Sequence, residues 1–414
     1  MGTFLSASRP RPLFWIGLVA IVALGVESGA YVVELLSARA FDEPIRRRST
    51  ILREQTSRIA LLIDSTPRRE VLDPLLGWRY RAGYASPLDH LSAQGLRSRR
   101  HYGAVPAPGT LRIAAFGDSF VYGNEVSDDD AWCAVLEAGS DAVEVLNYGV
   151  GGYGLDQAFL RYQSEGMALH PDVVLIGFTP DDLGRIVNVY RRFISSRELP
   201  LAKPRFVLIG DSLELVPNPL PRRQDYRNLM LNPAAVRALG KADDWYSRTI
   251  YEHPLYDALA TLRVGHALWQ RLQRRALDPN RLVRRGVFNE RSMAFQLQVA
   301  LLRAFAEAAR QRNAVPVVIL LPDRGSVAGV RRGAAAVYAP LEAALLKAGI
   351  NVWDAADAFR STSCTVDELF APGGHYSPRG NRVVAEWLRG ILAPDGHPTA
   401  PGAGPGRRSP RLPA

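Results

Sequence analysis

The ten residues LRIAAFGDSF, from Leu111 to Phe120, join an apolar run to a glycine, an acid and a hydroxyl. The apolar part contains a β-branched residue and stops at Gly117, which predicts a buried strand that enters a turn. Four further strand-like runs follow along the chain: VEVL (143–146), VVLI (173–176), VPVVILL (315–321) and INVW (350–353).

Helical patterns lie between these runs, most clearly at residues 293–310 and 337–348. Buried strands that alternate with amphipathic helices are typical of a parallel sheet covered on both faces. We therefore predict an α/β fold with three layers, α/β/α, and a mostly parallel central sheet.

The N-terminal region is strongly apolar. LFWIGLVAIVALGV occupies residues 13–26, and a second apolar run follows Glu27 at residues 31–36. A helix needs about 20 residues to cross a bilayer. A cleaved signal peptide with a site near Ala38-Arg39-Ala40 and a buried globular helix are the alternatives, but an uncleaved signal anchor, a transmembrane helix within residues 1–37, fits the length best.

Beyond this anchor the composition changes several times. Residues 38–76 are charged, with helically spaced apolar positions, and are interpreted as a juxtamembrane stalk. Residues 77–392 carry the strand and helix pattern, with an insertion at about 185–290, and residues 393–414 are rich in proline and glycine and are predicted to be disordered.

Composition excludes several classes of protein. The chain has 414 residues, 47% of them hydrophobic, and a formal charge of +10 that comes almost wholly from scattered arginines. A nucleic-acid reader concentrates its basic residues on one element, so no nucleic-acid partner is predicted. The two cysteines, Cys133 and Cys364, could form one bridge or remain buried thiols, but a disulfide framework or four-thiolate zinc site is excluded. The nucleotide-binding glycine loops, HExxH and CxxC are absent from the sequence, so no cofactor and no metal is predicted.

Ser119 is the candidate nucleophile. It follows the first strand and opens a helix, at the edge where open α/β sheets bind ligands. A plain helix cap is the alternative interpretation of this serine. The same tripeptide recurs at residues 210–212, but there it lies between two alternating apolar runs, which predicts a β-hairpin turn, and we reject Ser212 as a nucleophile.

Three later segments carry motifs that could belong to the same site as Ser119. NYGVGGYG (147–154) and GFTPDD (177–182) each follow a strand, and GHYSPRGN (374–381) precedes the last helical segment. Together with GWR (77–79) and GLR (95–97), this series resembles the SGNH/GDSL hydrolase superfamily, in particular bacterial members with one N-terminal span. The resemblance covers about residues 77–392 and implies a flavodoxin-like sheet.

The resemblance also implies roles for individual residues. Ser119 would be the nucleophile and one oxyanion donor through its backbone N–H, Gly152 the second donor, and His375 the general base. The family's third block carries an asparagine donor where this chain has Asp181, which would need to be protonated to donate, or be replaced by another group. The family's acid before the histidine is also missing. We take Asp367 as the displaced third member of the triad, with Glu368, Asp354 or a Ser–His dyad as the alternatives.

The function implied is that of a membrane-anchored serine ester hydrolase acting through an acyl-enzyme on Ser119. Its substrate would be an acylated small molecule or polysaccharide, such as an O-acetylated envelope glycan, which it would de-acetylate or use in acetyl transfer. The resemblance places the catalytic domain outside the cytoplasm, whereas the arginines after the span, counted alone, would place that side inside. The alternative is a catalytically degenerate domain that binds glycan or serves as a scaffold.

Overall fold

The computed structural model describes residues 12–40, 44–64, 68–276 and 282–392. The chain divides into two compact units. One comprises Met1–Asp64, Arg191–Pro200 and Tyr226–Asp278, and the other comprises Ser65–Tyr190, Leu201–Asp225 and Pro279–Ala414. The predicted disordered tail, residues 393–414, lies outside the described residues.

The second unit contains a five-stranded parallel sheet in the order β11-β10-β5-β3-β4. Its strands, in chain order, are β3 (Leu111–Phe116), β4 (Val143–Asn147), β5 (Val173–Phe178), β10 (Val315–Leu320) and β11 (Asn351–Asp354). Counted along the chain this is the flavodoxin-like order 2-1-3-4-5, in which the strand order reverses between β3 and β5. The predicted α/β fold with a parallel central sheet is confirmed.

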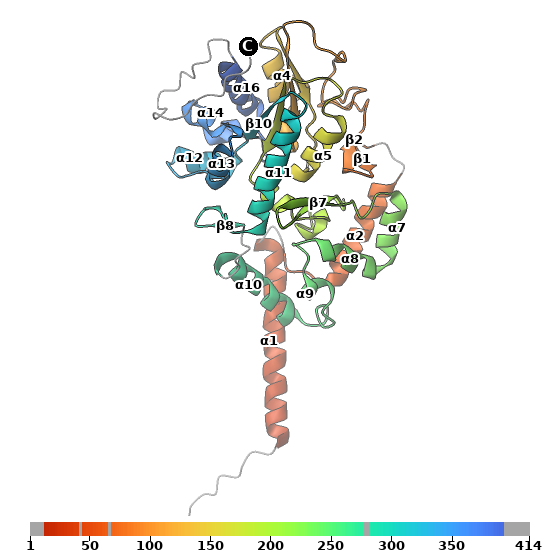
Figure 1. Ribbon diagram of the computed structural model, residues 1–414. Helices are drawn as coiled ribbons and strands as arrows, with labels where there is room; N and C mark the ends of the chain where they lie inside the picture. Colours follow the sequence, from red (N-terminus) through yellow and green to blue (C-terminus); the bar gives the residue numbers. More distant parts are fainter. Residues whose placement is uncertain (1–11, 41–43, 65–67, 277–281, 393–414) are drawn as a thin grey trace, which may run out of the picture. The chain divides into compact units, whose positions relative to one another are not determined.

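Helices cover both faces of this sheet (Figure 1). On one face lie α5 (Leu155–Glu165), α11 (Met293–Arg310) and α13 (Ala339–Lys347); on the other lie α4 (Trp132–Glu137), α12 (Arg324–Arg331), α14 (Ala356–Ser361), α15 (Val366–Leu369) and α16 (Pro378–Leu392). Alternate strand residues supply the two cores. Ile113 packs on the side of Trp132 and Val384, whereas the ring of Phe116 meets that of Tyr162.

Short antiparallel pairs complete this unit: β1 (Glu70–Asp73) with β2 (Gly77–Tyr80), β6 (Arg205–Ile209) with β7 (Ser212–Val216), and β8 (Val283–Arg284) with β9 (Val287–Phe288). The second Gly-Asp-Ser copy forms the turn between β6 and β7, where Ile209 pairs with Ser212. The prediction of a hairpin there is confirmed. Short helices α3 (Ser119–Tyr122) and α6 (Asp182–Arg185) follow β3 and β5.

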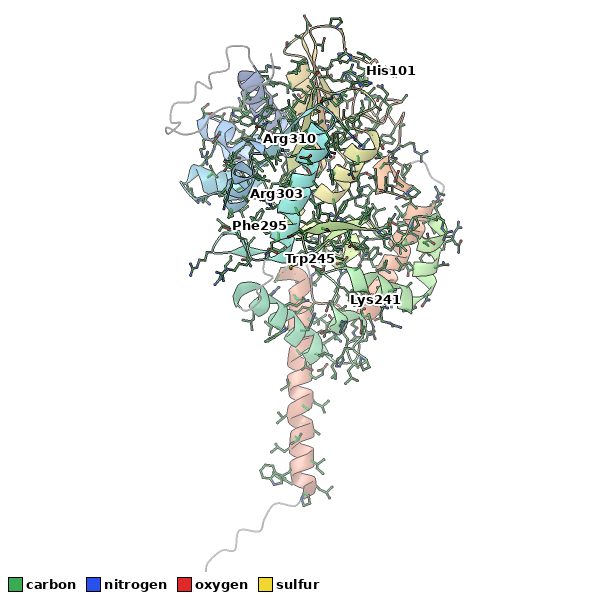
Figure 2. All side chains as sticks on the ribbon, in the orientation of Figure 1. His101, Lys241, Trp245, Phe295, Arg303 and Arg310 are labelled. Carbon is green, nitrogen blue, oxygen red and sulfur yellow. The ribbon has the colours of Figure 1, made fainter. Side chains whose placement is uncertain are left out.

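The other unit is helical. It consists of α1 (Pro12–Ala40), α2 (Arg48–Ile63), α8 (Pro233–Leu239), α9 (Arg248–Tyr251) and α10 (Ala260–Ala276), and most of α7 (Arg223–Leu231) also belongs to it. Among the described residues, α1 is the one helix long and apolar enough to cross a membrane, and a signal sequence would show the same properties. The side chains of its N-terminal half stand clear of the rest of this unit (Figure 2).

Candidate active site

Ser119 lies where β3 meets α3. Gly117 is required there because a Cβ at this position would come within 2.5 Å of Val121 Cγ2. The helix is capped by Asp118, whose carboxylate accepts a hydrogen bond from Phe120 N at 2.8 Å. Ser119 is therefore the first helical residue and not the cap, and its hydroxyl is available for other contacts although the residue is only 5% exposed.

His375, which comes much later in the chain, contacts this hydroxyl. It lies in the loop between α15 and α16, and its Nε2 is 2.8 Å from Ser119 Oγ. The imidazole packs beside the Phe120 ring, with 5.2 Å between ring centroids. The structure therefore brings together the two groups that the sequence separates by 256 positions.

Glu125 completes the series of contacts. Its Oε2 lies 2.6 Å from His375 Nδ1 and also accepts the His375 backbone N–H at 3.1 Å. Its Oε1 accepts the N–H of Gly373 at 2.7 Å. Burial opposes ionisation of this carboxyl, but the hydrogen bonds from His375 and Gly373 outweigh it and hold the pKa of Glu125 below its usual range.

The selection of Asp367 as the third member of the triad is therefore corrected. Asp367 lies on α15 with its side chain 82% exposed, and it forms an ion pair with Arg324. Of the two alternative acids, Glu368 bonds Thr365 and Arg379. Asp354 is buried and accepts hydrogen bonds from Tyr338 Oη and Ala356 N.

A steric reason links Glu125 to the glycines before the histidine. A Cβ on Gly373 would come within 2.6 Å of Glu125 Oε1, so the loop can receive this carboxylate only because Gly373 has no side chain. The signal in the sequence is that Pro372 and Gly373 occupy the positions of the expected acid, while an acid, Glu125, follows six residues after Ser119. Sequence spacing does not identify Glu125, because this residue lies 250 positions before His375.

Two backbone N–H groups are candidates for an oxyanion hole. Neither Ser119 N nor Gly152 N donates a hydrogen bond to another group in the part of the chain that the structure describes. The neighbouring N–H groups are occupied: Val150 N donates to Gly117 O at 3.0 Å and Gly151 N to Tyr80 Oη at 2.8 Å. Gly152 has φ +78°, a backbone conformation that other residues adopt only with strain.

Asp181 sits in a cluster of charges rather than acting as a donor. Its carboxylate is 76% exposed and lies 3.3 Å from Arg185 Nη2. The same guanidinium binds Asp118 Oδ2 at 2.7 Å. Burial and the nearby Asp118 carboxylate raise the pKa of the adjacent Asp182. Asp181 pairs with a cation in this arrangement, so the N–H groups of Ser119 and Gly152 remain the candidate oxyanion donors.

Residues of the upstream GWR and GLR segments support the loops of the site. The indole of Trp78 donates to Gly151 O at 3.2 Å, and Tyr153 Oη donates to Trp78 O at 2.5 Å. The guanidinium of Arg97 is buried and donates to the carbonyls of Tyr122 and Val126, on either side of Glu125. These contacts fix the glycine loop and the loop that carries the acid.

Comparisons with known proteins locate similar folds. No protein-family model matches the chain, and no curated protein matches it. Solved structures similar to this chain include a member of the lipolytic protein G-D-S-L family from Veillonella parvula (14% identity, TM-score 0.32, 69% of this chain and 99% of that chain). Others are a lipase/acylhydrolase from Enterococcus faecalis (14%, 0.32, 68% and 95%) and a two-domain esterase active on acetylated mannans (9%, 0.30, 68% and 49%). At these identities the function of this chain has to be argued from its own residues.

The arrangement can support one kind of chemistry. A hydroxyl, an imidazole and a carboxylate in hydrogen-bonded series, beside two free N–H groups, are the parts needed for acyl transfer through a serine. Among the described residues there is no group of three or more histidine, cysteine, aspartate or glutamate side chains that could hold a metal ion.

Proposed function

We propose that this chain is a serine ester hydrolase of the SGNH/GDSL type. The observation that carries the proposal is the continuous series Ser119–His375–Glu125, with heavy-atom distances of 2.8 Å and 2.6 Å. Both distances lie within hydrogen-bond range, which proton transfer from the serine hydroxyl to a general base requires.

The mechanism follows from these contacts. Ser119 Oγ attacks the ester carbonyl while its proton passes to His375 Nε2. The oxyanion that forms accepts hydrogen bonds from Ser119 N and Gly152 N. Glu125 holds the Nδ1–H tautomer and stabilises the imidazolium, which then protonates the leaving alcohol. Water activated by the same imidazole releases the acid from Ser119.

The carboxylate of Glu125 also bears on the alternative function. A degenerate binding domain was favoured by two departures from the family pattern, Asp181 and the missing acid before His375. Glu125 supplies that acid from another loop, so only Asp181 still supports the alternative. The contacts of Glu125 therefore favour an active hydrolase over a degenerate binding domain.

The finer features of the proposal rest on the resemblance. These are anchoring of the chain by α1, an extracytoplasmic catalytic domain, and an O-acetylated envelope glycan as acyl donor or acceptor. They also include the division into anchor, stalk, catalytic domain and insertion at the boundaries given above.

Hydrolysis of p-nitrophenyl acetate by the full chain tests the activity. We expect Ser119→Ala to lose it, and the matched variant Ser212→Ala, in the second Gly-Asp-Ser copy, to keep it. Equal rates for the wild type and Ser119→Ala would reject the enzyme and leave the binding domain.

A further inference from the structure

The helical unit exposes an apolar surface beside its candidate membrane helix. Leu268, Trp269 and Leu272 on α10 are 53%, 53% and 58% exposed, and Leu255 and Leu259, just before this helix, are also exposed. Large apolar side chains gathered on one surface mark a place where a partner or a membrane binds.

The two sides of α10 differ in chemistry. Successive helical residues are about 100° apart, since about 3.6 residues make one turn. One side therefore consists of uncharged residues: Leu262, Gly265, Leu268, Trp269 and Leu272. We call this side the outer face of α10.

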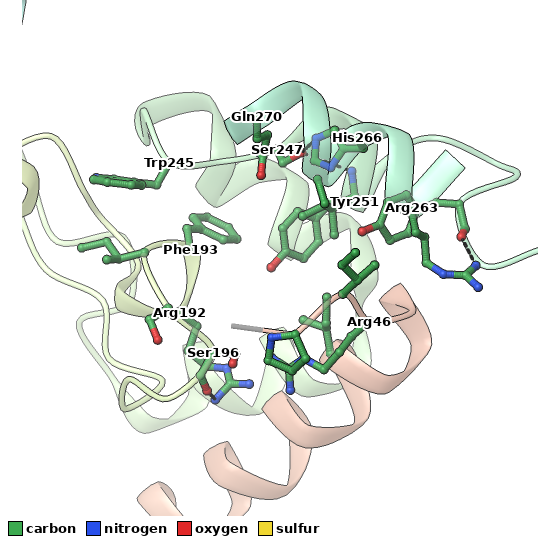
Figure 3. A pocket seen from close by; sticks show the side chains of 18 of the residues that line it. Arg46, Arg192, Phe193, Ser196, Trp245, Ser247, Tyr251, Arg263, His266 and Gln270 are labelled. Carbon is green, nitrogen blue, oxygen red and sulfur yellow. Dashed lines mark hydrogen bonds between the residues drawn. The ribbon is translucent and has the colours of Figure 1, made fainter. Parts of the chain in front are cut away.

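The opposite side of α10 faces the interior of the unit. Arg263, His266 and Gln270 line a cavity of about 440 Å³, which Phe193 and Trp245 line from two other parts of the unit (Figure 3). Arg263, His266 and Gln270 are therefore directed inward and Leu268, Trp269 and Leu272 outward, the reverse of what water as the surrounding solvent would select at these positions.

Contacts between α1 and α10 show which part of the candidate membrane helix lies beside α10. The carboxylate of Glu27 accepts hydrogen bonds from the N-terminus of α10, including Thr261 N at 3.1 Å and Thr261 Oγ1 at 2.7 Å. Two residues further along α10, Arg263 pairs with Glu34 at 2.6 Å. The helix α10 is thus attached to α1 between Glu27 and Glu34.

The length of α1 places this attachment at a membrane boundary. A hydrocarbon core of about 30 Å takes about 20 helical residues at about 1.5 Å per residue. Counted from Leu13, where the apolar run begins, the core ends near Val32, between the two glutamates that hold α10. Tryptophan and leucine on an amphipathic helix at this depth are typical of the interfacial layer.

We infer that the outer face of α10 lies in the interfacial layer of the bilayer crossed by α1, with a lipid surface as its partner. The inference goes beyond the proposed hydrolase activity and does not depend on Ser119, but it rests on the proposed anchoring of the chain by α1. In this arrangement α10 gives Glu27 hydrogen-bond donors and Glu34 an ion-pair partner near the membrane boundary, and lipid covers its own apolar side.

An environment-sensitive label at position 272 tests this inference. The full chain carrying Leu272→Cys and Cys364→Ser is labelled with NBD and reconstituted into vesicles of phosphatidylcholine and phosphatidylglycerol, with or without brominated acyl chains. Cys133 is buried, which leaves position 272 as the reactive thiol. The matched control is Ser57→Cys, an exposed position on α2 of the same unit.

We expect a blue-shifted emission at position 272 and quenching by brominated lipid several-fold stronger than at position 57. A second probe at Trp269→Cys should behave like position 272. Water-like emission at both α10 positions, or equal quenching at position 57, would overturn the inference. A blue shift without quenching by bromine would also overturn it, because protein rather than lipid would then cover the face. The esterase assay on the same labelled samples is a separate readout.

Discussion

At the scale of single residues, the site depends on an acid that lies far from its histidine in sequence. Glu125 has φ +69°, an uncommon conformation for a residue with a side chain. That backbone turn follows the C-terminus of α3 and directs the carboxylate back towards the loop at Gly373. The same carboxylate accepts three hydrogen bonds from this loop, so it both orients the imidazole and holds the loop in place.

Replacement of this acid gives the first prediction. Glu125→Gln should lower kcat for p-nitrophenyl acetate by about 10²–10⁴, because an amide cannot stabilise the imidazolium and favours the wrong tautomer. The matched control Asp367→Asn should leave kcat unchanged, since Asp367 is exposed and pairs with Arg324 at the surface. Equal losses in the two variants, or loss in Asp367→Asn alone, would reject Glu125 as the acid.

The residues of the site differ in how far the sequence could predict them. Ser119 and His375 could be predicted because each has local context, a strand before it or a helix after it. Glu125 could not, since its role depends on a left-handed turn and on the empty space at Gly373, neither of which has a spacing rule. The sequence shows that an aspartate, Asp181, replaces the family's asparagine. Its ion pair with Arg185 could be found only from the structure.

At the scale of elements, the sheet and its helices could be predicted well from hydrophobic pattern. The five apolar runs are the five parallel strands, and the pattern at residues 293–310 is helix α11. Strand order could not be derived from these runs alone, because it depends on which helix packs on which face. The reversal between β3 and β5 is what places Ser119 at an open edge of the sheet.

A buried ion pair beneath the glycine loop gives the second prediction. Lys203 Nζ contacts the Asp156 carboxylate at the start of α5, and both side chains are fully buried. Asp156→Ala leaves the ammonium without this partner and should lower the free energy of unfolding by about 3–5 kcal/mol. In urea titrations, the double variant Asp156→Ala/Lys203→Met should be less destabilised than the sum of its two single variants. Additive losses would contradict this coupling.

Asp354 at the end of β11 gives the third prediction, which concerns pH. Burial raises the pKa of this carboxyl to about 6 from an ordinary value of 3.8, despite its hydrogen bonds from Ala356 N and Tyr338 Oη. The native state therefore favours the protonated form. The stability that this group contributes is present below about pH 4 and is lost as pH rises through about 6.

Asp354→Asn keeps a neutral acceptor and should remove that loss. The difference in free energy of unfolding between variant and wild type, measured in urea at several pH values, should grow in favour of the variant from pH 4 to pH 7. A difference that stays constant over this interval would show that Asp354 titrates normally.

At the scale of the whole molecule, the chain combines a compact α/β unit with a helical unit that carries an apolar helix. The fourth prediction concerns this helix. The wild-type chain should remain in carbonate-washed membranes. Ala20→Arg/Val22→Arg should be released, because each central arginine costs about 2.5–3.5 kcal/mol in a bilayer. The matched control Ser57→Arg, on α2, should stay in the pellet. Retention of the double-arginine variant would contradict membrane anchoring by α1.

The central claim is that Ser119 is an activated nucleophile, and its most direct test is covalent labelling of the full chain with diisopropyl fluorophosphate followed by peptide mass mapping. Ser212 is an internal control, since it lies in the second copy of the Gly-Asp-Ser tripeptide and is exposed on a hairpin turn. The account predicts one equivalent of phosphoryl adduct on Ser119, none on Ser212, and no adduct in His375→Ala. An unlabelled Ser119, or labelling that follows exposure and favours Ser212, would contradict it.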